Sequence, residues 1–258
     1  MKVFVVNLAR SPERLARVSA RLAELGVEWE RFEAVDDSLL SAEERARGFS
    51  PWGWWCCTLM PPVRGQLGCA LSHCRIFQRM QAENLSAVCV LEDDVVLDDR
   101  FPEVLAWVDA HLDRSRSQVA LLSDHDGGAG RTAAEIHLEP SCWDWCSEGY
   151  VVTLPAATAM LKDNFPLRVM NDTWERWANQ GVVELFHVRP TVCSQRSAEH
   201  PEESEINRLP RVCEMPLAAR VYWKCRRVVG VALDAFSSPR RFRGRWVQLL
   251  RKLGLRRS

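Results

Sequence analysis

The strongest constraint on the fold of this chain is a short apolar run that ends in three consecutive carboxylates. Residues 87–91 read Ala-Val-Cys-Val-Leu, and Glu92, Asp93 and Asp94 follow directly. An apolar run of this length, closed by a polar turn, is typical of a strand buried on both faces. The run therefore predicts an α/β fold in which these carboxylates lie at the carboxyl end of a central strand, where ligands bind in open sheets.

The rest of the chain alternates between strand patterns and helix patterns. Strands separated by helices predict an α/β/α sandwich of the Rossmann type with a mostly parallel sheet. We expect the other strands at 1–7, 28–35, 119–122, 150–153 and 182–188. We expect helices at 12–25, 41–47, 69–81 and 102–111, another from about Pro155, and a short one capped by Asp172 that runs to Trp177.

One aromatic stretch interrupts this alternation. Residues 52–57 contain three tryptophans and lie between prolines, so we expect a loop there. Loop tryptophans can stack on acceptor sugars, lie at a membrane interface or pack in the core. For Trp143 and Trp145, core packing is the simpler expectation.

Composition limits the class of protein. The chain has 258 residues, of which 47% are hydrophobic, and its ten cysteines show no regular spacing. No apolar run approaches the roughly 18 residues of a membrane span, and the first apolar run lacks the features of a signal peptide. These features predict one large domain with reduced thiols in a cytoplasmic setting. We expect that domain at 1–196, a polar linker at 197–216 and a separate tail at 217–258.

The tail carries an unusual charge. The net charge of the chain is zero, yet residues 220–258 hold twelve Lys or Arg and one acid, Asp234. Apolar residues recur among these basic residues at spacings of three and four, which predicts two basic amphipathic helices. We expect them to bind an anionic membrane surface, and we expect no nucleic acid. A charged helical hairpin packed on the domain is the alternative.

The three carboxylates are suited to a metal ion. If the chain stays extended, Glu92 and Asp94 face one side of the strand and Asp93 faces the other. Paired oxygen ligands favour a hard divalent cation such as Mn²⁺ or Mg²⁺. The alternative is a solvated acidic turn.

A phosphate cradle is also needed if the ligand is a nucleotide. The sequence has no Gly-x-Gly-x-x-Gly and no P-loop pattern. The loop after the first strand supplies two guanidiniums and a helix amino terminus, both of which attract phosphate. We therefore expect donor binding by Asn7, Arg10, Ser11 and Arg14, the alternative being a capped helix with surface arginines.

Five segments, taken in order, carry a resemblance to a known family. They are Val-Phe-Val-Val-Asn-Leu-Ala-Arg-Ser-Pro-Glu-Arg at 3–14, Gly-Gln-Leu-Gly-Cys-Ala-Leu-Ser-His at 65–73, Leu-Glu-Asp-Asp-Val at 91–95, Glu-Gly-Tyr-Val-Val-Thr at 148–153 and Asn-Asp at 171–172. Over roughly residues 1–195 the chain resembles glycosyltransferase family 25, the bacterial lipooligosaccharide galactosyltransferase-like enzymes. The family pattern usually has Glu where Gln66 stands.

The resemblance implies a GT-A-type fold and an inverting, metal-dependent transfer of galactose or glucose from a UDP-sugar. The acceptor would be a saccharide or glycolipid of the lipopolysaccharide core, at the cytoplasmic face of the inner membrane. Asp94 would bind the metal, together with Glu92 and with His187 from a late strand. Glu92 and Asp93 would also contact the donor.

An inverting transfer needs a base for the acceptor hydroxyl. Asp172 is the first candidate, with helix capping as its alternative role. Glu148 and Asp126 follow, because both lie beside glycines in expected loops. His73 falls within an apolar helix pattern, which favours a structural role. The alternative function is a non-catalytic carbohydrate-binding or scaffolding protein that keeps the fold.

Overall fold

The structure is a computed structural model that describes residues 1–196 except 59–61, 64, 125–132, 143 and 145–146. Its centre is a seven-stranded sheet with the order β2-β1-β3-β7-β5-β8-β6. Among these described strands, five run in one direction, and β7 and β6 run against them. The predicted mixed α/β fold with a mostly parallel sheet is confirmed. The strands are β1 (Lys2–Asn7), β2 (Glu30–Glu33), β3 (Ala87–Glu92), β5 (Gln118–Leu121), β6 (His137–Ser141), β7 (Gly149–Thr153) and β8 (Glu184–Arg189).

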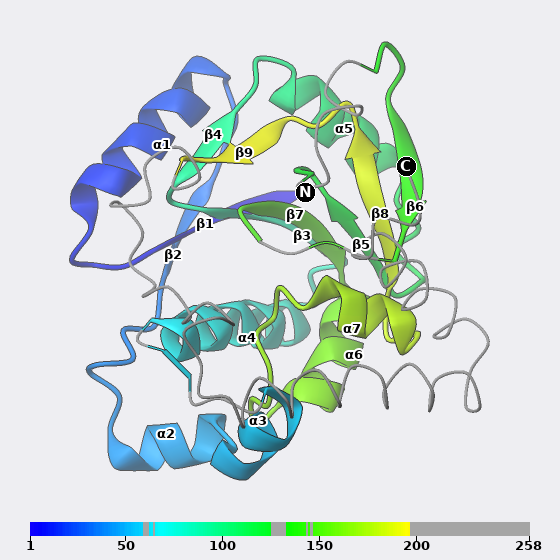
Figure 1. Ribbon diagram of the computed structural model, residues 1–258. Coiled ribbons are helices and arrows are strands. Elements are labelled where there is room, and N and C mark those ends of the chain that lie inside the picture. Colours follow the sequence, from blue (N-terminus) through cyan, green and yellow to red (C-terminus); the bar gives the residue numbers. More distant parts are fainter. Residues whose placement is uncertain (59–61, 64, 125–132, 143, 145–146, 197–258) are drawn as a thin grey trace, which may run out of the picture. The chain divides into compact units, whose positions relative to one another are not determined.

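Helices cover both faces of this sheet (Figure 1). On one face lie α1 (Pro12–Glu24) and α5 (Phe101–His111), and on the other lie α4 (Gln66–Glu83), α6 (Leu154–Asn164) and α7 (Trp174–Asn179). The period of two in strand β1 divides its side chains between the faces: Val3 and Val5 join the first core, and Phe4 and Val6 join the second. The apolar runs seen in the sequence are therefore strands buried on both sides.

Strand β3 lies between β1 and β7, and Val88, Cys89, Val90 and Leu91 are fully buried. After Glu92 the chain turns at Asp93 and Asp94 and enters β4 (Val95–Leu97), which pairs with β9 (Cys193–Gln195). The expected extended alternation of the three carboxylates is therefore wrong, because the turn lets Asp93 and Asp94 contact the same arginine. Three-residue strands such as β4 and β9 carry too little pattern for the sequence to show.

The aromatic stretch expected to be a loop is the helix α3 (Pro51–Thr58). Pro51 suits a first helical turn, and the Ser50 hydroxyl accepts a hydrogen bond from the Gly53 amide at 3.1 Å. A Cβ on Gly53 would lie 2.6 Å from Cγ of Arg168, so the helix packs closely on that segment. Tertiary packing, rather than amphipathic periodicity, therefore holds this helix.

The structure corrects the predicted capping role of Asp172, adds a strand that was not predicted, and confirms the short charged helix. Asp172 does not cap the following helix, because α7 begins at Trp174 with Thr173 at its N-cap. Strand β6 was not expected: it is an edge strand that contains Pro140, a residue that weakens a strand pattern. The short charged helix is present as α2 (Ala42–Gly48), begun by a capping box between Ser41 and Glu44.

The expected linker at 197–216 and basic tail at 217–258 lie outside the described residues, so the division of the chain stays a prediction. Within the part that the structure describes, no helix has the length and apolar character needed to cross a membrane.

The tryptophans of α3 differ sharply in burial, which gives a stability test. Trp54 is 2% exposed and meets Phe49 edge to face at 5.6 Å between ring centroids, whereas Trp52 is 76% exposed. We expect Trp54→Ala to lower the free energy of unfolding by about 3–5 kcal/mol, because it leaves a cavity. Trp52→Ala should change it by about 0.5 kcal/mol or less. Urea unfolding monitored by circular dichroism measures both, and equal losses would contradict the assigned packing.

Candidate functional site

A pocket opens at the carboxyl ends of β1, β2 and β3, with an empty volume of about 690 Å³ that includes space open to solvent. The loops after these three strands form most of its wall, and the amino-terminal part of α4 completes it. Its lining residues are Val6, Leu8, Arg10, Arg14, Ala34, Val35, Asp36, Asp37, Gly65, Cys69, Ser72, His73, Glu92, Asp93, Asp94 and Gln195. The structure thus brings Arg10, Arg14 and the three predicted carboxylates into one place.

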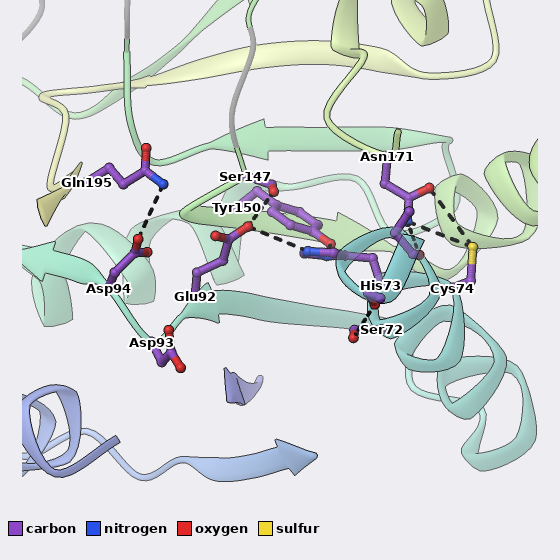
Figure 2. A network of polar contacts seen from close by, with 12 residues as sticks. Ser72, His73, Cys74, Glu92, Asp93, Asp94, Ser147, Tyr150, Asn171 and Gln195 are labelled. Carbon is purple, nitrogen blue, oxygen red and sulfur yellow. Dashed lines mark hydrogen bonds and ion pairs between the residues drawn. The ribbon is translucent and has the colours of Figure 1, made fainter. Parts of the chain in front are cut away.

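Glu92 is held by a buried polar network (Figure 2). The Ser147 hydroxyl donates to Oε1 of Glu92 at 2.6 Å, and Nε2 of His73 lies 3.7 Å from the same oxygen. On its other side, Nδ1 of His73 meets the hydroxyl of Tyr150 at 2.6 Å. Burial pushes the pKa of Glu92 upward, but the hydrogen bond and charge of His73, with smaller effects of Ser147 and Arg14, lower the pKa overall. Glu92 is therefore kept as a carboxylate.

Asp93 and Asp94 share one cation. Nη2 of Arg14 lies 2.6 Å from Oδ1 of Asp93 and 3.1 Å from Oδ2 of Asp94. Asp93 also accepts from Nδ2 of Asn7 at 2.7 Å. Asp94 accepts from Nε2 of Gln195 at 3.4 Å (Figure 2). Strand β1, helix α1 and strand β9 together fix the two carboxylates.

The pocket has a surplus of negative charge. Five carboxylates line it, those of Asp36, Asp37, Glu92, Asp93 and Asp94, against the two guanidiniums of Arg10 and Arg14. Arg10 pairs with Asp36, whereas Arg14 pairs with Asp93 and Asp94. A surplus of closely spaced carboxylates favours binding of a further cation.

The donor atoms fit a hard divalent cation. Carboxylate oxygens are the ligands that Mg²⁺ and Mn²⁺ prefer. The side chains of Cys69, His73 and Glu92 also place three potential ligand atoms within 4.8 Å of one another. However, burial, followed by the charge of Glu92, raises the pKa of the Cys69 thiol well above its usual range, so this thiol stays protonated at neutral pH. Oxygen ligands therefore suit the site better than a thiolate does.

The amino-terminal turn of α4 needs glycine to form the pocket wall. A Cβ on Gly68 would lie 2.4 Å from the carbonyl oxygen of Val35, so only glycine allows the helix to approach the loop after β2. Gly65 has a φ of +87°, and its amide donates to Asp37 at 3.0 Å. Gln66, where the family pattern has Glu, accepts a hydrogen bond from the Val63 amide through Oε1 at 2.9 Å. A carboxylate oxygen would serve equally, so this departure leaves the wall intact.

Two of the three predicted bases, Asp172 and Glu148, lie near the triplet. Burial, followed by the charge of Glu92, raises the pKa of Asp172 to about 6, and Glu148 adds to the shift. Glu148 is fully buried, and its backbone carbonyl accepts from the amide of Glu92 at 2.9 Å. A carboxyl group with a pKa near 6 is a suitable general base at neutral pH. Asp126 lies outside the described residues.

His187 belongs to a different cluster. Its Nε2 lies 3.1 Å from Asp144 and its Nδ1 lies 3.7 Å from Asp124, which also pairs with Arg189 at 2.6 Å. Strands β7 and β5 separate β3 from β8, a distance of roughly 14 Å at about 4.8 Å per strand. The structure therefore does not bring His187 together with Asp94, and a metal-binding role for it stays a prediction.

Two of the expected donor-binding residues, Asn7 and Ser11, lie at the end of β1 and the start of α1, beside the acidic triplet. Asn7 is 1% exposed, and its amide nitrogen contacts both Asp93 and the carbonyl oxygen of Ser11, the latter at 2.9 Å. Ser11 occupies the N-cap of α1 without a capping hydrogen bond from its side chain. Asn7 thus ties the end of β1 to the triplet and to the start of α1.

The sequence reasoning missed several residues of the pocket. Asp36 and Asp37 follow β2 as the triplet follows β3, so the same argument about strand ends would have found them. Gln195 comes 101 residues after Asp94 in the chain, on a strand too short to be recognised. His73 was assigned a structural role, but it also lines the pocket.

The fold and the pocket define a general class, an α/β protein with an acidic pocket at the carboxyl edge of a mostly parallel sheet, where open sheets bind ligands. Residues 1–126 match the sequence model of glycosyltransferase family 25 (LPS biosynthesis protein). The predicted resemblance to glycosyltransferase family 25 is therefore confirmed over this part of the chain.

Relatives with this family name include eukaryotic proteins. A glycosyltransferase 25 family member of Drosophila pseudoobscura pseudoobscura is 30% identical over 172 residues, which cover 62% of this chain and 26% of the relative. Human procollagen galactosyltransferase 2 is 26% identical over 63% of this chain and 28% of its own length. Human inactive glycosyltransferase 25 family member 3 is 32% identical over 39% of this chain and 17% of its own length. The chain spans about a quarter of the length of the first two.

The pKa of Asp172 predicts how stability depends on pH. The folded protein holds this proton more tightly than the unfolded chain, so the resulting stabilisation is complete below the ordinary pKa of 3.8 and is lost as the pH rises through about 6. With chelator present, Asp172→Asn should match the wild type near pH 4 and exceed its free energy of unfolding by up to about 3 kcal/mol at pH 7.

Urea unfolding at a series of pH values measures this difference. Asp99→Asn, on an exposed side chain, serves as the control and should show a difference that does not grow over this range. A constant difference for Asp172→Asn would contradict the raised pKa.

Proposed function

We propose that this chain is an inverting, metal-dependent glycosyltransferase of the GT-A type that transfers galactose or glucose from a UDP-sugar. The observation that carries the proposal is the charge of the pocket, in which five carboxylates face two guanidiniums. A diphosphate is itself an anion and would be repelled from such a pocket unless a cation binds with it. The match to the model of glycosyltransferase family 25 supports glycosyl transfer in general.

The pocket offers a separate place for each part of the donor. Val6, Leu8 and Ala34 give an apolar surface suited to a nucleoside base. Asp36 and Asp37, at the end of the second strand, are suited to accept hydrogen bonds from ribose hydroxyls. Glu92, Asp93 and Asp94 would then lie beside the diphosphate.

Asp94 and Asp93 are the residues that would hold Mn²⁺ or Mg²⁺, with Glu92 as a further oxygen ligand. When bound, the ion would neutralise the charge that develops on the departing diphosphate. His73 and Ser147 keep Glu92 ionised, and the Tyr150 hydroxyl holds His73 in place, so the carboxylates need little rearrangement. Such preorganisation is a large part of electrostatic catalysis.

Asp172 is the proposed base for the acceptor hydroxyl. Its raised pKa, caused by burial and by Glu92, gives it a basicity suited to work near neutral pH. Glu148 contributes to that shift and stays the second candidate. Inversion needs one such base and no covalent enzyme intermediate.

The acceptor is proposed to be a saccharide or glycolipid, with the lipopolysaccharide core as one form. The human relative named procollagen galactosyltransferase 2 makes a protein acceptor a competing choice. Trp52 and Trp55 are 76% and 49% exposed on α3 and offer rings for a sugar or a lipid interface. Docking of the basic tail on the inner membrane from the cytoplasm belongs to the same proposal.

A non-catalytic carbohydrate-binding protein is the second candidate. The observation in its favour is the relative named inactive glycosyltransferase 25 family member 3. Against it stand the complete acidic triplet and the buried network that keeps Glu92 ionised. A protein without catalysis has no need to concentrate charge beside a diphosphate.

Asp94→Asn tests the proposal, with Asp99→Asn as a matched change on an exposed side chain nearby in the sequence. We expect Asp94→Asn to lower transfer from radiolabelled UDP-galactose or UDP-glucose by about 100-fold or more, since a ligand to the leaving-group cation is lost. Asp99→Asn should stay within about twofold of the wild type. Full activity of Asp94→Asn, or of the wild type with excess chelator, would contradict metal dependence.

A further inference from the structure

Arg14 occupies an unfavourable position for a basic residue. It lies in the first turn of α1, where the helix dipole is positive and disfavours cations. Its side chain is 15% exposed, and its guanidinium contacts Asp93 and Asp94, which are 9% and 6% exposed. The two buried carboxylates therefore explain why a cation lies here.

We propose that Arg14 is a displaceable counter-cation: it neutralises Asp93 and Asp94 in the empty site and moves to the donor's diphosphate once a divalent cation has bound these carboxylates. The inference rests on the proposed function and adds an order of binding, in which the metal comes before the donor. It also gives one side chain two successive roles.

The first argument is competition for the same atoms. A single nitrogen, Nη2 of Arg14, contacts Oδ1 of Asp93 and Oδ2 of Asp94 at 2.6 and 3.1 Å. A divalent cation on these oxygens would place two cations within contact distance of each other. A histidine in this position would relieve the repulsion by losing a proton, but an arginine side chain keeps its charge at any ordinary pH. Arg14 must therefore move.

The second argument is the place to which Arg14 can move. Its side chain lines the pocket that the donor would fill, so a rotation of its flexible stem keeps the guanidinium within the same space. A planar guanidinium is well suited to bind phosphate through paired hydrogen bonds. The displaced Arg14 would then add one positive charge to the diphosphate site.

This exchange couples the two ligands. While Asp93 and Asp94 hold Arg14, the guanidinium is engaged elsewhere and contributes little to phosphate binding. Metal binding releases it, so the metal raises donor affinity and, by reciprocity, the donor raises metal affinity. Arg10 offers a matched comparison because it lines the same pocket but pairs with Asp36.

The first test measures Mn²⁺ affinity without nucleotide, from the electron paramagnetic resonance signal of free Mn²⁺. Loss of the competing cation should make Arg14→Gln bind Mn²⁺ about tenfold more tightly than the wild type, within the usual range of such couplings. Arg10→Gln and Arg14→Lys should stay within about threefold, because the first leaves the pair untouched and the second keeps a cation. Circular dichroism checks that each variant folds.

The second test measures UDP affinity by calorimetry. With saturating Mn²⁺, Arg14→Gln should bind UDP about tenfold more weakly than the wild type, and without metal the two should agree within about twofold. An equal loss of UDP affinity with and without metal would overturn the proposal, as would weaker Mn²⁺ binding by Arg14→Gln. If the wild type binds no Mn²⁺, the proposed function itself fails.

A measurement on the wild type covers the case in which Arg14→Gln does not fold. Mg²⁺ alone should shift the nuclear magnetic resonance of the Nε–Hε group of Arg14 toward that of a solvated arginine, while that of Arg10 changes little. An unmoved Arg14 resonance at saturating Mg²⁺ would overturn the proposal.

Discussion

The surplus of negative charge at the end of β3 is the constraint on which the rest of the site depends. Burial of Val88 to Leu91 between two layers of helices fixes where Glu92, Asp93 and Asp94 emerge. Carboxylates so close together are stable only with cations or hydrogen-bond donors around them. Arg14, Asn7, Ser147 and His73 are those partners, and each comes from a different part of the chain.

These partners connect the fold to the chemistry. Gly68 lets α4 approach the loop after β2, which brings His73 to Glu92 and forms the wall opposite α1. The antiparallel strand β7 carries Tyr150 beside His73 and places Glu148 against Glu92. Burial, followed by the charge of Glu92, raises the pKa of Asp172, so the carboxylate that would help to hold a cation would also make the proposed base more basic.

The sequence predicted best those features of the fold that depend on a single strand. The apolar run before Glu92 predicted β3 and the place of the carboxylates at its carboxyl end, because a buried strand can be recognised without distant information. The turn at Asp93 was not predictable, since it depends on pairing of β4 with β9 some 100 residues away in the chain. Helix α3 was missed because packing of Trp54 and Gly53 holds it. The sequence did not show that His187 lies apart from Asp94, because the strand order decides which strand ends are neighbours.

The central claim is that a divalent cation and a nucleoside diphosphate bind this pocket together. The most direct measurement is the thermal unfolding midpoint with UDP-galactose or UDP-glucose, with and without Mn²⁺. A ligand at about 100 times its dissociation constant stabilises the folded state by about 2.7 kcal/mol, a rise of roughly 5–10 °C for a domain of this size. The account predicts this rise only when sugar nucleotide and Mn²⁺ are both present. An equal rise in the presence of chelator, or no rise with any combination, would contradict it.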